Sequence, residues 1–130
     1  MLGLFQPPPQ RCYTGGIMEF KEYQEKSRVT ARYPQLGDNL PYLTLGIAGE
    51  AGEVADKVKK FIRDGNFTSI RDLTKEQKDE LMKELGDVLW YLAQIATELG
   101  YELDGVAAAN IEKLYSRMDR GMLGGSGDNR

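Results

Sequence analysis

Residues 45–62 read LGIAGEAGEVADKVKKFI, an apolar helical pattern that is interrupted by two carboxylates, Glu50 and Glu53. A second segment, KELGDVLWYLAQIA at residues 83–96, is built in the same way around an acidic pair of its own. The two segments share the template E-x-G-[E/D]-V, with a glycine inside each acidic pair. Glycine weakens a helix by about 0.5–1 kcal/mol relative to alanine. The repeated pattern therefore indicates a functional site built on two helices.

Helical periodicity continues on both sides of these segments and predicts an all-α fold. Pro34–Pro41 and Asp64-Gly65-Asn66 interrupt the period and separate the first three helices. Thr74 and Gln77 match a capping box that opens the third helix, and Asp104 is the expected N-cap of the fourth. No segment alternates with the period of a strand over a useful length. The predicted helices cover residues 19–33, residues 40 or 42 to 63, 75–99 and 105–120.

The length of 130 residues predicts one domain. Residues 1–17 contain three consecutive prolines and a pair of glycines and show no period, so we expect a flexible leader. Residues 18–121 form the predicted folded domain. Residues 122–130 are glycine-rich and are expected to be a C-terminal tail.

Net charge and apolar runs limit the partners of the chain. A net charge of −3 gives no broad attraction for a nucleic-acid polymer or an anionic membrane. No apolar run approaches the roughly 18 residues of a transmembrane helix, and the first residues lack the pattern of a signal peptide. The single cysteine, Cys12, excludes an intrachain disulfide framework. We expect a cytoplasmic protein, in the host cytoplasm if a phage encodes it.

The absence of histidine limits the available chemistry. It excludes Ser-His-Asp and Cys-His nucleophile systems, most zinc sites, and the Glu-x-x-His ligands of a ferritin-like di-iron bundle. Any catalysis must therefore rely on carboxylates, lysines, arginines and a hard metal ion.

Helical geometry places both acidic pairs in the same position relative to their apolar stripes. Each residue of a helix turns about 100°, so residues three apart lie about 60° from each other on one flank. Lys57 falls between the first pair, and Tyr91 takes the corresponding place on the second helix. If the two helices pack through their apolar stripes, all four carboxylates come together. The four carboxylates are Glu50, Glu53, Glu84 and Asp87.

Four anions held together at a core edge repel each other and lose hydration, which costs several kcal/mol. Mg²⁺ compensates this cost because it prefers carboxylate oxygens and keeps positions for substrate phosphates. The alternative is local ion pairing, of Glu50 with Lys57 or Lys113 and of Glu84 with Lys83 or a neighbouring arginine. Both acidic pairs lie on the same flank of the apolar stripe of their helix, and this agreement favours the metal site over local ion pairing.

The fourth predicted helix carries a donor-rich stripe. Asn110, Lys113 and Arg117 follow the spacing i, i+3, i+7 and share one face that suits a triphosphate. An exposed face balanced by Glu112 and Asp119 explains the same spacing equally well. Aromatic residues near the acidic pairs, such as Trp90 and Tyr91, suit stacking on a base, but such spacing is more often that of core residues.

Together these motifs resemble a known family. GEAGEV…ELGDV, flanked by LPYLTLGIA and VLWYLAQIA and followed by N-I-E-K-x-x-x-R, is similar to the MazG-like all-α nucleoside triphosphate pyrophosphohydrolases. The likeness is to their short, single-domain members from bacteriophages and bacteria, and it covers residues 19–120. Two features depart from the family pattern. Gly49 stands where a further glutamate often precedes Glu50, and the stretch between Glu53 and Glu84 is long.

The resemblance implies a four-helix MazG-like bundle, completed by oligomerisation into a dimer or tetramer. It implies Mg²⁺-dependent hydrolysis of (deoxy)nucleoside triphosphates to the monophosphate and pyrophosphate in nucleotide-pool metabolism, with Mn²⁺ as a substitute metal. The four carboxylates of the two acidic pairs would be metal ligands and catalytic residues. The implied phosphate contacts are Asn110, Lys113, Arg117, Tyr91 and Lys57.

Two points stay open from the sequence. The same helices would also suit a non-catalytic oligomeric bundle that binds a nucleotide or a protein partner. Among substrates we favour (d)GTP weakly, because the amides of Gln24 and Asn39 are suited to reading a guanine edge.

Overall fold

The computed structural model describes residues 16–65 and 67–121, and within these ranges it contains four α-helices and no strand. The predicted all-α class is therefore confirmed. Residues 1–15 of the predicted leader and the whole predicted tail, 122–130, lie outside the described residues. The elements are α1 (Phe20–Val29), α2 (Leu40–Gly65), the 3₁₀ turn η1 (Ile70–Asp72), α3 (Lys75–Glu98) and α4 (Leu103–Asp119).

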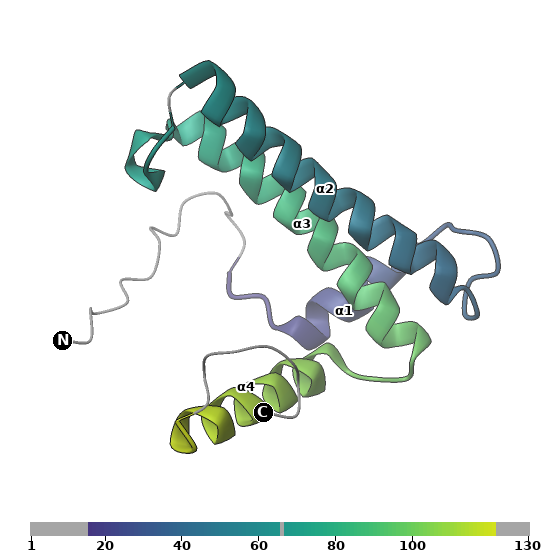
Figure 1. Ribbon diagram of the computed structural model, residues 1–130. Helices are drawn as coiled ribbons and strands as arrows, with labels where there is room; N and C mark the ends of the chain where they lie inside the picture. Colours follow the sequence, from purple (N-terminus) through teal and green to yellow (C-terminus); the bar gives the residue numbers. More distant parts are fainter. Residues whose placement is uncertain (1–15, 66, 122–130) are drawn as a thin grey trace.

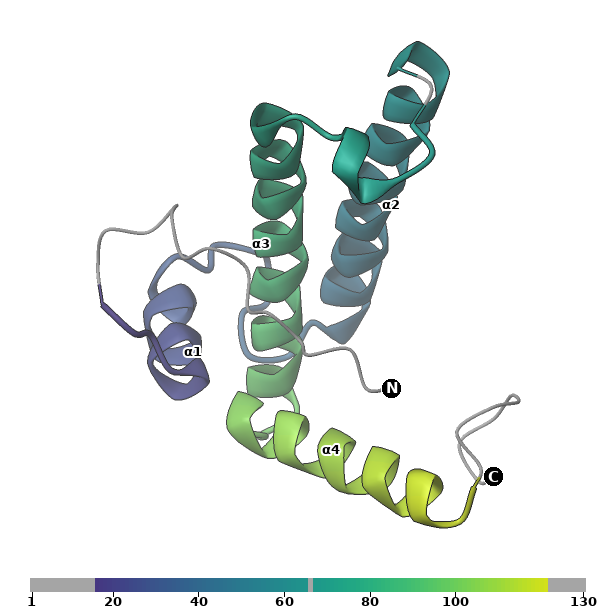
Figure 2. The same cartoon turned by 90° about the vertical axis from the view of Figure 1, so that its left-hand side faces the viewer.

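The two long helices, α2 and α3, form an antiparallel pair that lies side by side along its length (Figure 1). α1 and α4 pack at the end of the pair where α3 ends (Figure 2). α4 contacts α1 and α3, and it has no contact with α2. One face of the α2–α3 pair is thus left without a helix of the same chain against it.

The first helix is shorter than predicted. It ends at Val29, whereas the sequence pattern extended it to Tyr33. Ala31 and Tyr33 are both buried, although positions two apart point in nearly opposite directions on a helix. Residues 31–33 are not helical, so both side chains can be buried together, and Pro34 disfavours the helical conformation at Tyr33.

The predicted start of the third helix is confirmed, and that of the fourth is wrong. The Thr74 side chain accepts a hydrogen bond from the Gln77 backbone amide, and the Gln77 side-chain oxygen accepts one from the Thr74 backbone amide, as the capping box requires. α4 begins at Leu103 instead of after Asp104, and its own N-cap residue makes no side-chain bond. The first amide of α4 is capped from α1, because Leu103 N donates to Gln24 Oε1 at 2.7 Å.

Few apolar side chains are fully buried within one chain. Four leucine and isoleucine positions of the apolar stripes that were expected to form the core remain exposed: Ile62 at 53%, Leu85 at 57%, Leu92 at 36% and Leu99 at 53%. No described helix is both long and apolar enough to cross a membrane. The buried apolar residues of the described chain are Ala31, Tyr33, Leu43, Leu73, Ala93, Ala96 and Leu103.

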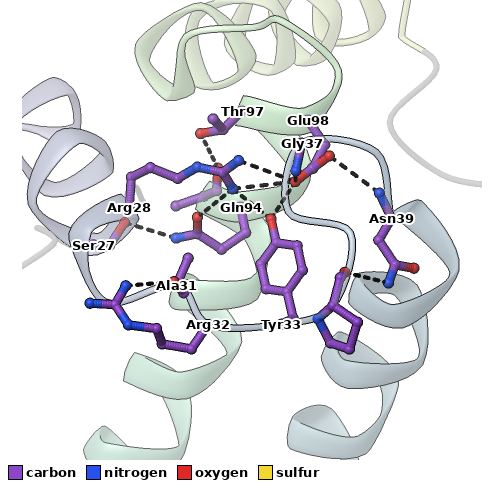
Figure 3. A network of polar contacts seen from close by, with 12 residues as sticks. Ser27, Arg28, Ala31, Arg32, Tyr33, Gly37, Asn39, Gln94, Thr97 and Glu98 are labelled. Carbon is purple, nitrogen blue, oxygen red and sulfur yellow. Dashed lines mark hydrogen bonds and ion pairs between the residues drawn. The ribbon is translucent and has the colours of Figure 1, made fainter.

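A polar cluster fixes the α1–α2 loop to the end of α3 (Figure 3). The Glu98 side chain is only 3% exposed. It accepts hydrogen bonds from the Arg28 guanidinium at 3.3 Å and from the Tyr33 hydroxyl. The backbone amides of Gly37 and Asn39 also donate to it, at 2.9 and 3.4 Å.

The bonds from Tyr33, Gly37 and Asn39 tie the loop to α3, and those from Arg28 tie α1 to it. Gly37 adopts φ +98°, a conformation that favours glycine, and its amide reaches the Glu98 carboxylate. Asn39 then caps α2, because its side-chain oxygen accepts from the Tyr42 amide at 3.1 Å. The start of α2 is therefore set by its attachment to the end of α3.

Candidate metal centre

The antiparallel pairing of α2 and α3 brings specific residues face to face. Gly46 of α2 lies against the ring of Tyr91 of α3. One helical turn further along α2 and one turn back along α3, Glu50 meets Asp87. About two turns further along α2, the Lys57 ammonium lies 3.9 Å from a carboxylate oxygen of Glu80 on α3. The two predicted acidic segments are thus in register with each other.

Three of the four predicted carboxylates converge. Glu50, Glu84 and Asp87 each present one carboxylate oxygen, and these oxygens all lie within 4.8 Å of one another. Oxygens that share a Mg²⁺ at about 2.1 Å each must lie within about 4.2 Å, so a small rotation of the side chains completes the geometry. Glu50 and Glu84 are partly buried, and Asp87 is exposed.

The electrostatics at Glu50 favour a cation. Burial raises the pKa of the Glu50 carboxyl above its usual range, and the negative charges of Asp87 and Glu84 raise it further. Glu53 adds a smaller effect in the same direction. Negative charge therefore accumulates at this point of the helix pair, and a hard divalent cation is the ligand that relieves it.

Glu53 is the fourth predicted carboxylate, and it lies outside the group of converging oxygens. Its side chain is exposed, although it is close enough to Glu50 to influence its pKa. Its role as a metal ligand stays a prediction.

Lys57 lies at the edge of the cluster. Its ammonium is 3.4 Å from a Glu84 oxygen and 3.9 Å from a Glu80 oxygen. One part of the local ion-pairing alternative is thus present, since Glu84 has a cationic neighbour. It comes from α2, however, and not from the adjacent Lys83.

Tyr91 lies on the other side of the carboxylates. The pKa of its hydroxyl is raised by burial and then by Tyr42, which shares a hydrogen bond with it; the charges of Glu50 and Asp87 raise it further. Its ring meets Trp90 edge to face, with 5.0 Å between centroids. Trp90 packs against the core and donates its ring N–H to the Thr30 hydroxyl at 2.8 Å. Trp90 thus packs against the end of α1, whereas Tyr91 packs against α2.

The predicted stripe of α4 is not brought onto the carboxylates within one chain, because α4 has no contact with α2. Asn110 and Lys113 are exposed, whereas Arg117 is buried, with 5% of its surface accessible. Their role in phosphate binding stays a prediction.

The two amides that suggested a guanine contact have other partners. Gln24 caps α4 through its oxygen and donates its NH₂ group to Thr97 Oγ1 at 3.0 Å and to the Tyr101 carbonyl at 2.9 Å. Asn39 caps α2 and donates to the Pro34 carbonyl at 2.8 Å. Both side chains make structural hydrogen bonds within the fold, so they no longer support a preference for (d)GTP.

Sequence reasoning missed two features of this region. The Arg28–Glu98 cluster was missed because its members are 70 residues apart in the chain. The contact at Gly46 was missed because several glycines of α2 look alike in the sequence, and only the register with α3 distinguishes them. A signal was nevertheless present, since Gly46 is one turn from Glu50 and Tyr91 is one turn from Asp87.

Comparisons with known proteins agree with this arrangement. Residues 38–122 match the MazG nucleotide pyrophosphohydrolase domain, a range that includes α2, α3 and α4. The chain is 49% identical over 113 residues to the Gene 37 protein of Mycobacterium phage L5, covering 83% of this chain and 96% of that protein. It is 33% identical over 81 residues to the Uncharacterized protein YvdC of Bacillus subtilis (strain 168), covering 61% of this chain and 76% of that protein. No solved structure matches significantly.

The match to the family model covers more than half of the chain, and it contains both helices that supply the acidic cluster. The expected resemblance is thereby confirmed: this chain belongs to the MazG nucleotide pyrophosphohydrolase domain family.

Proposed function

We propose that this chain hydrolyses (deoxy)nucleoside triphosphates to the monophosphate and pyrophosphate in a reaction that depends on Mg²⁺, with Mn²⁺ as a substitute. The observation that carries the proposal is the convergence of Glu50, Glu84 and Asp87 from two helices. Membership of the MazG family supports the same class of reaction.

Glu50, Glu84 and Asp87 would hold the metal. When bound, a divalent cation neutralises phosphate charge and lowers the pKa of a coordinated water. The chain's own donor set fits such an ion, because it consists of carboxylates whose burial and mutual repulsion raise the pKa of Glu50. Lys57 neutralises part of the charge on Glu84 at the edge of the site.

In the reaction, a carboxylate must orient the attacking water and accept its proton, since the chain has no histidine. Glu53 suits this role because it is exposed and lies next to the converging group; Glu50 is the alternative base. The water oxygen bonds to the α-phosphorus while the bond to the α–β bridging oxygen breaks, and pyrophosphate leaves.

The phosphates also need cationic and hydrogen-bonding contacts. Lys57 and Tyr91 flank the carboxylates and are close enough to serve. We assign the remaining contacts to the stripe of α4, formed by Asn110, Lys113 and Arg117.

Because α4 does not contact α2 in its own chain, we propose that a second copy brings this stripe to the site. The exposed leucines of α3 support a homodimer or homotetramer, since an aqueous surface disfavours such apolar positions in one stripe. No membrane or nucleic-acid polymer is needed for the reaction.

The decisive experiment measures pyrophosphate and monophosphate separately after incubation with each natural (d)NTP and Mg²⁺. We expect equimolar release of both products by the wild-type protein. Glu50→Gln and Asp87→Asn should each reduce the rate by about a hundredfold or more while leaving helicity unchanged. Glu112→Gln, which changes an exposed carboxylate on α4, is the control for the loss of one negative charge.

The same panel tests the base preference. A preference for (d)GTP stays a prediction, and Gln24 and Asn39 no longer support it, because both amides hold helix ends. If the wild type releases neither product from any triphosphate, the hydrolase proposal fails, and binding of a nucleotide without hydrolysis becomes the better account.

A further inference from the structure

Gly46 is a point of close contact between α2 and α3. A Cβ atom added at Gly46 would lie 2.0 Å from Cε1 of Tyr91, 2.4 Å from its Cζ and 2.6 Å from its Cδ1. All three distances are far below van der Waals contact, so the Tyr91 ring lies directly on the α2 backbone. At Gly49, Gly52 and Gly86, in contrast, an added Cβ meets nothing within 4 Å. Among the glycines of α2 and α3, Gly46 is therefore the one at which a neighbouring side chain occupies the space of a Cβ atom.

Neighbouring side chains hold the Tyr91 ring in this position. Trp90 meets it edge to face at 5.0 Å, and the Tyr42 hydroxyl shares a hydrogen bond with it. Tyr42 is in turn stacked on Tyr33, with 5.4 Å between ring centroids. The Tyr33 hydroxyl is fixed by Glu98 (Figure 3). The ring cannot leave its place without disturbing several packed aromatic residues.

The contact lies one helical turn from the carboxylates on both helices. Gly46 precedes Glu50 by four residues on α2, and Tyr91 follows Asp87 by four residues on α3. One turn advances only about 5.4 Å, so a change in helix separation at the Gly46 contact is transmitted to the Glu50–Asp87 pair. The three ligand oxygens lie within 4.8 Å of one another, close to the greatest spread that one small ion spans. Further separation would take them out of reach of one small ion.

We propose that Gly46 is a positioning residue for the metal centre: by admitting the Tyr91 ring against α2, it sets the helix separation at which Glu50 and Asp87 share one divalent cation. This inference rests on the proposed function, because it assumes that the carboxylates bind a metal. It assigns Gly46 no contact with substrate or metal.

The test is a double-mutant cycle that measures Mn²⁺ affinity by electron paramagnetic resonance, without substrate. The four proteins are the wild type, Gly46→Ala, Tyr91→Ala and the double variant. We expect Gly46→Ala to weaken Mn²⁺ binding by about tenfold or more when Tyr91 is present, as loss of a supporting contact typically does. In the Tyr91→Ala background the same change should alter the affinity by less than about twofold, because the clash is gone.

Gly49→Ala is the matched control. It makes the same chemical change on the same helix and is adjacent to Glu50, but its Cβ enters open space. Both substitutions raise helix propensity equally. We expect Gly49→Ala to leave the Mn²⁺ affinity within about twofold of the wild type.

The outcomes separate the two claims. If the wild type binds no Mn²⁺, the proposed function and the positioning role both fail. If the wild type binds Mn²⁺ but Gly46→Ala behaves like Gly49→Ala, or weakens binding equally with and without Tyr91, only the positioning role fails. If Gly46→Ala does not fold, recovery of the fold and of Mn²⁺ binding in the double variant supports the inference, and a double variant that also stays unfolded overturns it.

Discussion

The ammonium of Lys57 lies 3.4 Å from a carboxylate oxygen of Glu84, and this ion pair joins α2 to α3 at the edge of the acidic cluster. Both side chains are partly shielded from solvent, with 27% and 18% of their surfaces exposed. The lysine thus supplies one positive charge where three carboxylates converge. A metal ion at the cluster would be repelled by that charge, although the ion pair stabilises the metal-free protein.

Replacement of Lys57 by methionine separates these two effects. In EDTA we expect Lys57→Met to lower the free energy of unfolding by about 1 kcal/mol, because Glu84 loses its partner. With saturating Mn²⁺ the increase in melting temperature should be larger than for the wild type, because the repulsion of the metal is gone. Thermal unfolding with and without Mn²⁺ measures both. An equal metal-induced increase in the two proteins would contradict this role of Lys57.

The raised pKa of Glu50 predicts a pH dependence of the metal-free protein. Between about pH 4.3, the usual value for glutamate in an unfolded chain, and its raised value in the fold, the folded state binds more protons than the unfolded state. The free energy of unfolding therefore falls as the pH rises through this window.

The variant Glu50→Gln removes this titration. In EDTA the free energy of unfolding of the variant should exceed that of the wild type at pH values above the raised pKa of Glu50. The difference should vanish below about pH 4.3. Urea denaturation of both proteins at several pH values measures the effect. A variant that is less stable than the wild type throughout would show that Glu50 stabilises the metal-free fold instead.

The pKa of the Glu98 carboxyl is shifted in the opposite direction, below its usual value. Burial alone would raise its pKa, but hydrogen bonds from Tyr33, from the Gly37 and Asn39 amides and from Arg28 together lower it. Its contribution to stability is therefore present above about pH 4.3 and is lost as the pH falls through the lowered pKa.

Glu98→Ala should destabilise the protein by about 2–3 kcal/mol, because the partly buried Arg28 guanidinium and the neighbouring hydroxyl and amide donors lose their acceptor. Glu112→Ala removes an exposed carboxylate and serves as the control. Chemical denaturation at neutral pH gives both values. Equal free energies of unfolding of the two variants would mean that water replaces the Glu98 carboxylate as acceptor at little cost in stability.

Leu85 tests the proposed contact between copies. Leu85→Glu places a charge on an exposed apolar position of α3, so we expect the oligomer to dissociate. Ile70→Glu makes the same kind of change on η1, away from the helix pair, and should not affect assembly. Light scattering after size exclusion measures the mass of each protein. If Leu85→Glu retains the wild-type mass, the α3 face is not the interface.

The sequence predicted the features that depend on local pattern. The start of α2 and the capping box of α3 follow from residues a few positions apart, and these predictions were accurate, whereas α2 ends at Gly65, two residues later than predicted. The convergence of Glu50, Glu84 and Asp87 also followed from local pattern, because both helices carry the same template in the same phase. Antiparallel packing through the apolar stripes was then sufficient to bring the three carboxylates together.

The features that were missed depend on long-range contacts. The cap of α4 comes from Gln24, a residue of another helix, so a search for a local N-cap chose Asp104. Tyr33 was assigned to the first helix because its spacing fits a helical period, but tertiary packing buries it in the non-helical segment that follows α1. Which glycine of α2 accepts Tyr91 depends on the register between the two helices, and the spacing of the residues reveals it only once Glu50 is known to lie beside Asp87.

The central claim is that Glu50, Glu84 and Asp87 together bind one divalent cation, and direct Mn²⁺ titration of single variants tests it. The account predicts one site per chain in the wild type and a loss of affinity of about tenfold or more in each of Glu50→Gln, Glu84→Gln and Asp87→Asn. Glu53→Gln should bind Mn²⁺ nearly as well as the wild type while losing most of its hydrolytic rate. Wild-type affinity in the three ligand variants, or no Mn²⁺ site in the wild type, would contradict the account.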